Sequence, residues 1–453
     1  MGSGVIGRGR RPVFVTVLAL ALLTTTALLS DAGRAQACAF LRTPFAFEAE
    51  AERASYLATI EAASVDALFP GDPYFGVPAL EAGSREARVD GAGGYRLPAT
   101  ILKAIAWEES ALTMASRATP FLSTGPALVS FDCGHGVMQI TTGMTVPLGE
   151  GSQATDRQVN VATHYAYNIT RGAVILAEKW NQAPEDRPIA GSDSGGDPAV
   201  VENWYFAVWG YNGFTGPGSN SSNHPLDPGR SAWPRPAYQC DGSQARNSYP
   251  YQELIWGCMA NPPVRAGAAL WAPLPASQPD FTQPQYLLPL AIKNWAYPYS
   301  AMDMPTPQPA HTDVVPSVAP DFRQRTLASP SLGLSTSSVT VRLDGTPQDA
   351  RAEVMLHNSG TGILSWAATA DENWIVIDPP AGVALGGDLG CQPPECSATA
   401  ELTITVNPTL LPQASAIGIV TITPTNASGS ARTLRVEVDG DFEVAAPGTS
   451  RAY

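Results

Sequence analysis

The sequence predicts a multidomain protein in which a mainly α-helical domain is followed by an all-β sandwich. Three observations predict this fold class. Apolar residues recur at helical spacing in several stretches before residue 215, prolines recur every few residues from 271 to 329, and apolar residues then alternate with polar ones as in strands. The chain has 453 residues, enough for two or three domains, and its hydrophobic fraction of 44% supports real cores.

The first 37 residues are typical of a secretory signal peptide. Arginines precede an apolar run from Val13 to Leu29, and Ala35-Gln36-Ala37 offers a small-residue cleavage site. A retained membrane anchor is the alternative, although Thr24–Thr26 interrupt the run. No later segment is apolar enough to span a bilayer. We therefore expect a secreted protein, extracellular or associated with the cell envelope, with no stable membrane span after cleavage.

The net charge and the cysteines exclude several classes of partner. The formal charge of −14 becomes more negative when the arginines of the signal segment are removed. Nucleic-acid binding depends on basic patches, so no nucleic-acid partner is expected. Six cysteines in a chain with an export signal predict disulfides, and neither their spacing nor the five scattered histidines fit a metal site. Sequence leaves the pairing open; the pairs considered are Cys38–Cys133, Cys240–Cys258 and Cys391–Cys396.

The segment 38–270 contains the predicted helices. Residues 45–68, rich in Ala and Glu, predict an amphipathic N-terminal helix. Pro98 suits a first turn, and nothing breaks the helix from Ala99 to Leu112. Two further helices are predicted over 160–182 and 200–212. Between and after these helices, the Gly-rich and Asp-rich stretch 183–199 and the stretch 213–250, rich in Gly, Asn, Ser and Pro, predict surface loops.

The remainder of the chain divides into a Pro-rich linker, 271–329, and a β-domain, 330–445. The linker is predicted to be stiff and extended in part, but its run 286–292 is apolar enough to pack on a neighbouring domain. In the β-domain, short strands are separated by turn signals such as Asn358-Ser359-Gly360, which predicts a sandwich. The alternating apolar positions are Val339, Val341 and Leu343, then Leu402, Ile404 and Val406, then Leu434, Val436 and Val438.

Two adjacent glutamates on the helix 99–112 are candidates for acid catalysis. A carboxylic acid that delivers a proton near neutral pH must be partly desolvated. Glu109 continues the apolar spacing of Leu102 and Ile105, which places it at the edge of an apolar stripe. Glu108 has a similar stripe of its own, and periodicity does not separate the two.

Three downstream blocks bear groups suited to a sugar-binding cleft. In Gly136-Val137-Met138-Gln139-Ile140, the glycine permits close approach of the backbone, Met138 suits packing on the catalytic helix, and Gln139 can hydrogen-bond substrate. Asn168 with Gly172 suits helix capping and close packing. In Tyr211-Asn212-Gly213, the phenol can hold a carboxylate in place.

Taken in order, Glu109-Ser110 and these three blocks resemble the motifs of the lytic transglycosylases, which cut the glycan strands of bacterial peptidoglycan. The resemblance covers about residues 95–215 and implies a lysozyme-like fold and no cofactor. It implies Glu109, which directly precedes Ser110, as the single acid and base. It also implies that Gln139 lies near substrate and that Tyr211 faces the acid. The supporting residues it implies are Ser110, Gly136, Met138, Gln139, Asn168, Tyr211 and Asn212.

The β-domain resembles BACON and related immunoglobulin-like modules of exported bacterial proteins. This resemblance rests on the block His357–Trp366, on a second tryptophan in the block Asn373–Gly382, and on the terminal strands. It implies an immunoglobulin-like fold and is nearly silent on function. The β-domain could space the enzyme from the cell wall, bind glycan or bind protein, and the sequence does not choose among these roles.

Three alternatives stay open. Asp132 lies close to where goose-type lysozymes, a related family, carry an auxiliary aspartate, so a glycan hydrolase using Glu109 and Asp132 is the first. A non-catalytic wall-binding protein is the second, and a surface protein dominated by its β-domain is the third. An insertion at 118–130 and the extended loop at 183–199 depart from the transglycosylase pattern and could reshape the subsites or favour another amino sugar polymer such as chitin.

Overall fold

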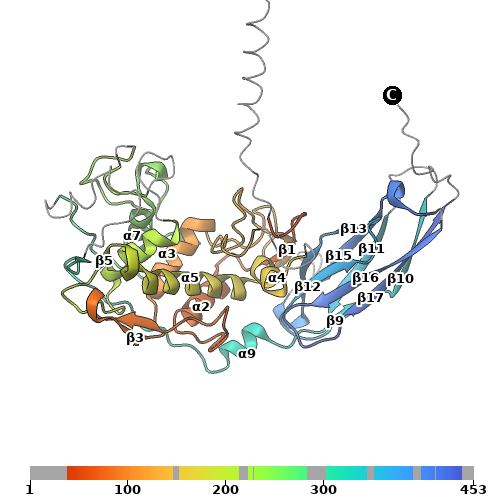
Figure 1. The fold of residues 1–453 in the computed structure, drawn as a ribbon, viewed down its shortest axis with the longest axis horizontal. Helices are drawn as coiled ribbons and strands as arrows, with labels where there is room; N and C mark the ends of the chain where they lie inside the picture. The colour runs from red at the N-terminus through yellow and green to blue at the C-terminus, as the bar shows by residue number, and fades with distance from the viewer. Residues whose placement is uncertain are drawn as a thin grey trace, which may run out of the picture.

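The computed structural model shows a chain with a helical part followed by a β-rich C-terminal part (Figure 1). It describes residues 38–145, 153–213, 223–227, 229–282, 303–343, 351–390, 399–413 and 415–440. The predicted signal peptide, the apolar run 286–292 and the pair Cys391–Cys396 lie outside the described residues. Among those residues, no helix is both long enough and apolar enough to cross a membrane.

Helix α5 (Tyr165–Asp186) lies at the centre of the helical part, with the other helices packed around it (Figure 1). Its apolar residues, among them Ile169, Leu176 and Trp180, are buried in one large hydrophobic cluster. Around α5 lie α2 (Ala54–Ala63), α3 (Ala99–Ser110), α4 (Asp156–Thr163), α6 (Tyr205–Tyr211) and α7 (Tyr251–Ala260). The arrangement presents the C-terminal end of α3 toward α7.

The predicted helix over 45–68 is wrong at its start. Residues Phe45–Glu48 form strand β1, which pairs antiparallel with β4 (Ser123–Pro126). The Glu48 carboxylate accepts hydrogen bonds from the backbone amides of Met114 and Ala115 and pairs with Arg53. Arg53 has a φ of 62°, a left-handed conformation that no helix continues through. The chain therefore turns at Arg53, and only α2 is helical.

The predicted helix over 160–182 is two helices separated at His164. This residue is extended, with φ −123° and ψ 119°, and its side chain accepts a hydrogen bond from the backbone amide of Ala166. Helix α4 starts with a capping box between Thr155 and Gln158. The predicted helix over 200–212 is a 3₁₀ turn, Val201–Trp204, followed by α6. Helix α3 ends at Ser110 because Ala111 and Leu112 both have φ of 56°.

The Pro-rich segment is not a free linker where the structure describes it. Strand β8 (Asp303–Met304) pairs in parallel with β5 (Ile189–Ala190), inside the predicted loop 183–199. The Asp313 carboxylate accepts a 2.7 Å hydrogen bond from the Thr100 amide, so it satisfies a donor in the first turn of α3. The segment ends in the short helix α9 (Phe322–Leu327), which lies below the junction of the two parts (Figure 1).

Two further hairpins and the irregular stretch before α7 complete the helical part. Strand β2 (Leu80–Ala82) pairs with β3 (Val89–Gly94), and β6 (Val264–Arg265) pairs with β7 (Ala268–Ala269). Between α6 and α7 the described residues are irregular apart from a 3₁₀ turn at Arg246–Ser248, as the composition predicted.

The C-terminal part is a sandwich of two sheets, as predicted. The first sheet has the strand order β10-β17-β16-β12-β14 and the second β13-β15-β11-β9; β10 and β17 are parallel and all other pairs antiparallel. The strands are β9 (Leu332–Leu334), β10 (Ser338–Leu343), β11 (Arg351–Asn358), β12 (Ile363–Ala370), β13 (Ile375–Asp378), β14 (Ala381–Leu385), β15 (Ala400–Val406), β16 (Ala416–Pro424) and β17 (Arg432–Gly440). The predicted alternating residues face the core around Trp366 and Trp374.

The sandwich docks on the helical part through α4 (Figure 1). Asn160 donates a 3.1 Å hydrogen bond to the Thr425 carbonyl, and the Thr425 hydroxyl donates a 2.6 Å bond back to the Asn160 side chain. Beside this pair, Thr163 donates a 3.0 Å bond to Ser365. Ile363, Val383 and Leu385 of the sandwich belong to the hydrophobic cluster of the helices. The two parts are therefore joined by a packed contact.

Candidate active site

Two disulfides lie close to the candidate cleft, and both were among the pairs considered from sequence. Cys38 is bonded to Cys133, and Cys240 to Cys258. The first joins the start of the described chain to the loop that carries Asp132. The second joins the segment before α7 to α7 itself, beside Glu108.

Glu109 sits on the last turn of α3, half-buried, with its carboxyl oxygen Oε1 accepting a 2.6 Å hydrogen bond from the Tyr251 hydroxyl. Burial raises the pKa of Glu109 to about 7, and the negative charges of Glu108 and Asp132 add to the rise. The hydrogen bond from Tyr251 and the charge of Arg246 act in the opposite direction. A carboxyl group in this state holds its proton near neutral pH and can also release it.

Glu108, the rival that periodicity left open, has a different environment. Its carboxylate is buried and pairs with Arg246 at 2.6 Å, and its Oε1 lies 3.2 Å from the sulfur of Cys258. A disulfide sulfur has no proton to donate, so Arg246 is the group that neutralises this charge. Burial raises the pKa of Glu108 and Arg246 lowers it. An acid held in an ion pair is a poorer proton donor than Glu109, because the guanidinium favours the carboxylate.

Glu109 lies where two cavities meet. One has a volume of about 470 Å³ and is lined by Asp132, Gln139, Tyr211 and Asn212; the other has about 840 Å³ and runs along Tyr238, Asn261 and Pro263. Both are also lined by Glu108, Glu109 and Arg246. A ligand longer than one sugar can therefore occupy both sides of the Glu109 carboxyl at once.

The Gly136–Ile140 block forms a turn held against the end of α3. Gly136 has a φ of 68°, and a Cβ on it would lie 2.5 Å from the Met114 sulfur and 2.7 Å from the Asn168 side chain. The Ser110 hydroxyl donates a 2.8 Å hydrogen bond to the Val137 carbonyl. Gln139 lines the smaller cavity with a strained φ of 44°, and its side-chain amide donates to the Gly136 carbonyl. Ser110 and Gly136 thus fix the turn that presents Gln139.

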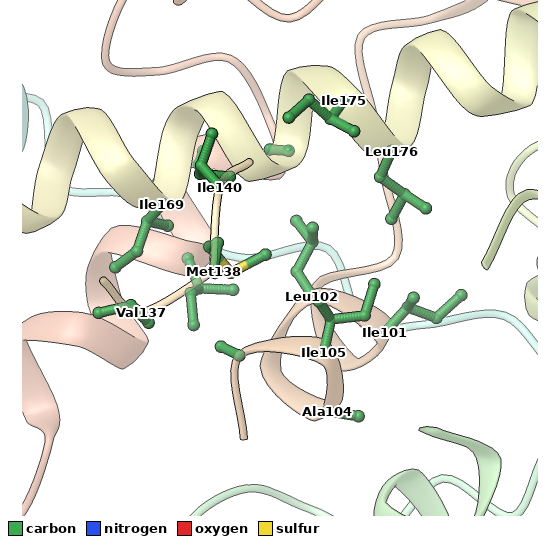
Figure 2. Packing of buried hydrophobic residues seen from close by; sticks show 14 of the residues in the cluster. Ile101, Leu102, Ala104, Ile105, Val137, Met138, Ile140, Ile169, Ile175 and Leu176 are labelled. Carbon is green, nitrogen blue, oxygen red and sulfur yellow. The ribbon is translucent and has the colours of Figure 1, made fainter. Parts of the chain in front are cut away.

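Met138 and Asn168 hold this turn on the helical core. Met138 is buried between α5 and α3, near Ile169 and Leu102 (Figure 2). Asn168 is fully buried; its oxygen accepts from the Met138 amide at 2.9 Å, and its nitrogen donates to the carbonyls of His135 and Val161. Both residues therefore hold the turn from within the hydrophobic core, and neither lines either of the two cavities.

Tyr211 does not make the hydrogen bond expected of it. Its hydroxyl donates a 3.1 Å hydrogen bond to the Met138 carbonyl, and Tyr211 lines the smaller cavity. Burial raises the pKa of Tyr211, and the negative charge of Glu109 raises it further. The hydroxyl that donates to the Glu109 carboxyl belongs to Tyr251 and not to Tyr211. Asn223 links Tyr251 to Asn212, the neighbour of Tyr211: its side-chain amide donates to the Asn212 side chain, and its oxygen accepts from the Tyr251 backbone amide.

Asp132 lies in the same cavity as Glu109. Its carboxylate is exposed and accepts a 2.5 Å hydrogen bond from the Ser130 hydroxyl. Glu108, Cys240 and Cys258 form the one group in the described chain whose positions suit a metal, but both sulfurs are in a disulfide and cannot ligate as thiolates.

Comparison with known proteins identifies the C-terminal part. Residues 333–433 match the family model of the Viral BACON domain. The sandwich is a BACON domain. The match runs from β9 to the first residues of β17. No curated protein matches the chain.

Solved structures show slight similarities. A GH5 xyloglucanase from Bacteroides ovatus has 16% identity, TM-score 0.17, and a match covering 24% of this chain and 19% of that one. The chaperone DraB of E. coli has 12% identity and TM-score 0.19, covering 25% and 56%. A protein of unknown function from Porphyromonas gingivalis W83 has 19% identity and TM-score 0.20, covering 26% and 51%. The chain spans less than two thirds of each of these three chains.

Gly172 supports the cleft by leaving room for Met138, which gives a testable prediction. An added Cβ would lie 2.7 Å from both Cε and Cγ of Met138. In Gly172→Ala, the higher helix propensity of alanine stabilises the fold by about 1 kcal/mol, but overpacking against Met138 destabilises it by about 1–3 kcal/mol. We therefore expect a lower Tm. The matched control is Gly210→Ala in α6, where the nearest atom lies 3.6 Å away and only the gain applies. Thermal unfolding measures both; a Tm raised equally in the two variants contradicts this packing.

Proposed function

We propose that the protein is a secreted lytic transglycosylase with a lysozyme-like catalytic domain. It cleaves the β-1,4 bond between N-acetylmuramic acid and N-acetylglucosamine in peptidoglycan and leaves a 1,6-anhydro end. One observation carries the proposal. Glu109 is a carboxyl group with its pKa raised to about 7, bound by a tyrosine hydroxyl, at the junction of two cavities. The order of motifs in the sequence supports the same assignment.

In the first step, protonated Glu109 donates its proton to the glycosidic oxygen as the bond to muramic acid C1 breaks. A pKa of about 7 keeps about half of the molecules protonated at neutral pH, while proton transfer from the acid stays favourable. Burial supplies most of this rise, so the apolar side of α3 is what prepares the acid.

In the second step, the Glu109 carboxylate draws the proton from the C6 hydroxyl of muramic acid, and the C6 oxygen bonds to C1. No water is consumed, and Glu109 returns to its protonated form. The Tyr251 hydroxyl stabilises the carboxylate between the two steps and keeps its oxygen in place. One carboxyl group therefore serves both steps.

The groups around Glu109 suit a sugar polymer. Gln139 and Asn212 offer amide donors and acceptors in the smaller cavity, and Asn261 and Tyr238 line the larger one. Such uncharged groups bind hydroxyl and acetamido groups by hydrogen bonds in either direction. The chain has a formal charge of −14, so long-range electrostatic attraction to an acidic wall cannot account for binding. Hydrogen bonds from uncharged groups agree with this charge.

A zymogram tests the proposal against a protein that only binds the wall. The purified chain from residue 38 onward is run in a gel containing peptidoglycan and renatured. An enzyme clears the gel around its band, whereas a binding protein or a surface protein does not. A folded protein that leaves the gel opaque and releases no soluble fragments from sacculi contradicts the proposal.

A hydrolase using Glu109 and Asp132 is the second candidate. The observation that favours it is the position of Asp132 in the cavity of Glu109, close enough for its charge to raise the pKa of Glu109. A second carboxylate can activate water for attack on the sugar, which a transglycosylase does not need.

The variant Asp132→Asn separates these two candidates. In a transglycosylase the change removes a negative charge that raises the pKa of Glu109, so we expect kcat within about threefold of wild type and a slightly lower pKa on the alkaline limb of the pH profile. In a hydrolase the same change removes the base and costs about 10²–10⁴-fold. The initial rate of fragment release from sacculi between about pH 5 and pH 9 measures both quantities. A loss in the larger range overturns the transglycosylase assignment.

A further inference from the structure

A third cavity, of about 540 Å³, lies beyond the end of α3 and is lined by three arginines. Arg53, Arg117 and Arg265 face it together with a single carboxylate, Glu48. The whole chain has 41 acidic and 27 basic residues, so this local excess of positive charge runs against the composition. Arg53 precedes α2, Arg117 follows α3, and Arg265 lies on β6.

The protein neutralises only one of the three guanidiniums. Glu48 pairs with Arg53 at 2.6 Å, and its other oxygen already accepts the amides of Met114 and Ala115. Arg53 is only 3% exposed, and the Nε atoms of Arg53 and Arg265 are buried without a hydrogen-bond partner. Arg117 is exposed and lines the cavity, with no hydrogen bond or ion pair to the described part of the chain. The cavity thus has two positive charges beyond what Glu48 balances.

Arg265 is held in an unfavourable position for a cation. Burial lowers its pKa, and repulsion from Arg53 lowers it further. Its contacts are a long 3.5 Å hydrogen bond to the Ala111 carbonyl and a position 5.4 Å from the centre of the Trp107 ring. An anion in the cavity would relieve the repulsion and supply the missing acceptors.

This basic cavity continues the candidate groove. It shares Ala111 and Arg117 with the 840 Å³ cavity, which in turn contains Glu109. A ligand lying across Glu109 and along the larger cavity therefore brings its side groups to the arginines.

The insertion 118–130 builds one wall of this cavity. Its residues Thr119, Pro120 and Phe121 line the cavity, and the Phe121 ring lies 5.0 Å from the Arg53 guanidinium. Strand β4 inside the insertion pairs with β1, which fixes the wall next to Glu48. The site therefore depends on the segment in which this chain departs from the transglycosylase pattern.

We propose that Arg53, Arg117 and Arg265 form a carboxylate-binding subsite for the peptide stem of the peptidoglycan strand, an inference that rests on the proposed function. Guanidinium groups bind carboxylates through paired N–H donors. The sugar backbone of such a strand carries hydroxyl and amide groups, and its carboxylates belong to the peptide stems. The subsite therefore makes the enzyme prefer strands that still carry their stems.

The test compares kcat/KM on two substrates, glycan strands with stems and the same strands stripped of stems by an amidase. The lactyl carboxylates that the amidase leaves on muramic acid are converted to methylamides, so that the stripped strands carry no carboxylate. We expect the wild type to favour stem-bearing strands by at least about tenfold, the value of one charge-assisted hydrogen bond. In Arg117→Gln this ratio falls about tenfold through KM, and Arg117→Lys restores part of it. The matched control is Arg435→Gln on β17, an exposed arginine of the BACON domain, which keeps the wild-type ratio.

The outcomes separate this inference from the proposed function. No turnover of either substrate by the wild type defeats the proposed function and this inference with it. Turnover of both substrates with equal kcat/KM, or a ratio unchanged in Arg117→Gln, keeps the enzyme and overturns the subsite. An equal loss on both substrates in Arg117→Gln also overturns it, because the arginine then acts on the glycan and not on the stem.

Discussion

Glu109→Gln is expected to lower kcat for peptidoglycan cleavage by about 10²–10⁴-fold, the usual contribution of a general acid. Glutamine has nearly the same shape and can still accept the hydrogen bond from Tyr251, so the cleft keeps its form while the transferable proton is lost. The measurement is the initial rate of soluble fragment release from purified sacculi. The control is Glu108→Gln, which leaves the Tyr251–Glu109 pair in place and should keep at least about a tenth of the wild-type rate.

Glu109→Gln should also change the free energy of unfolding, in a direction that depends on pH. The pKa of Glu109 is about 7 in the folded protein and 4.5 as its ordinary value, so the folded state holds the proton more tightly. Wild-type stability therefore falls as pH rises from about 4.5 through about 7, whereas the glutamine of the variant does not titrate. Relative to wild type, Glu109→Gln should gain about 1–3 kcal/mol between about pH 4.5 and pH 8. A Tm difference between the variant and wild type that is the same at about pH 4.5 and about pH 8 contradicts a partly buried acid with a raised pKa at this position.

Tyr251→Phe is expected to lower kcat by about 10–100-fold, because the carboxyl of Glu109 loses the group that holds its position. The change also has a signature in pH. The hydrogen bond from Tyr251 holds the pKa of Glu109 down, so its loss raises that pKa above 7. The first step of the proposed mechanism requires the protonated acid, so the alkaline limb of the pH profile should move to higher pH. The rate of fragment release from about pH 5 to pH 9 measures both effects.

Tyr211→Phe is the matched control for this variant. The Tyr211 hydroxyl donates to the Met138 carbonyl and not to Glu109, so its loss should leave the alkaline limb close to the wild-type position. A shift in Tyr211→Phe as large as that in Tyr251→Phe would mean that the two phenols have the same role, against the geometry described above.

Local patterns predicted several parts of this protein well. Helix α3 follows from Pro98 and an unbroken run of helix formers, and the sandwich follows from alternating residues such as Val341 and Ile404, which are buried as expected. The blocks at 136–140 and 211–213 were predicted to lie near Glu109, and Gln139 and Tyr211 line one cavity with it. Periodicity could not separate Glu108 from Glu109, since the difference arises from Arg246, far away in sequence.

The features that sequence missed depend on contacts between distant segments. Tyr251 meets Glu109 across 142 residues and follows a stretch that is typical of loops, so no local pattern indicates its role. Residues 45–48 have helical composition but become a strand because the insertion supplies β4 as a partner. The BACON domain docks on α4 through hydrogen bonds between Asn160 and Thr425. The sequence around neither residue predicts this contact.

Mass spectrometry of the muropeptides released by the chain from residue 38 onward tests the central claim most directly. Wild-type protein and Glu109→Gln are incubated with the same purified sacculi. We expect fragments with 1,6-anhydro-muramic acid ends from the wild type and almost none from the variant. Fragments with reducing ends alone, or anhydro ends released equally by Glu109→Gln, would contradict a transglycosylase that works through the Glu109 carboxyl.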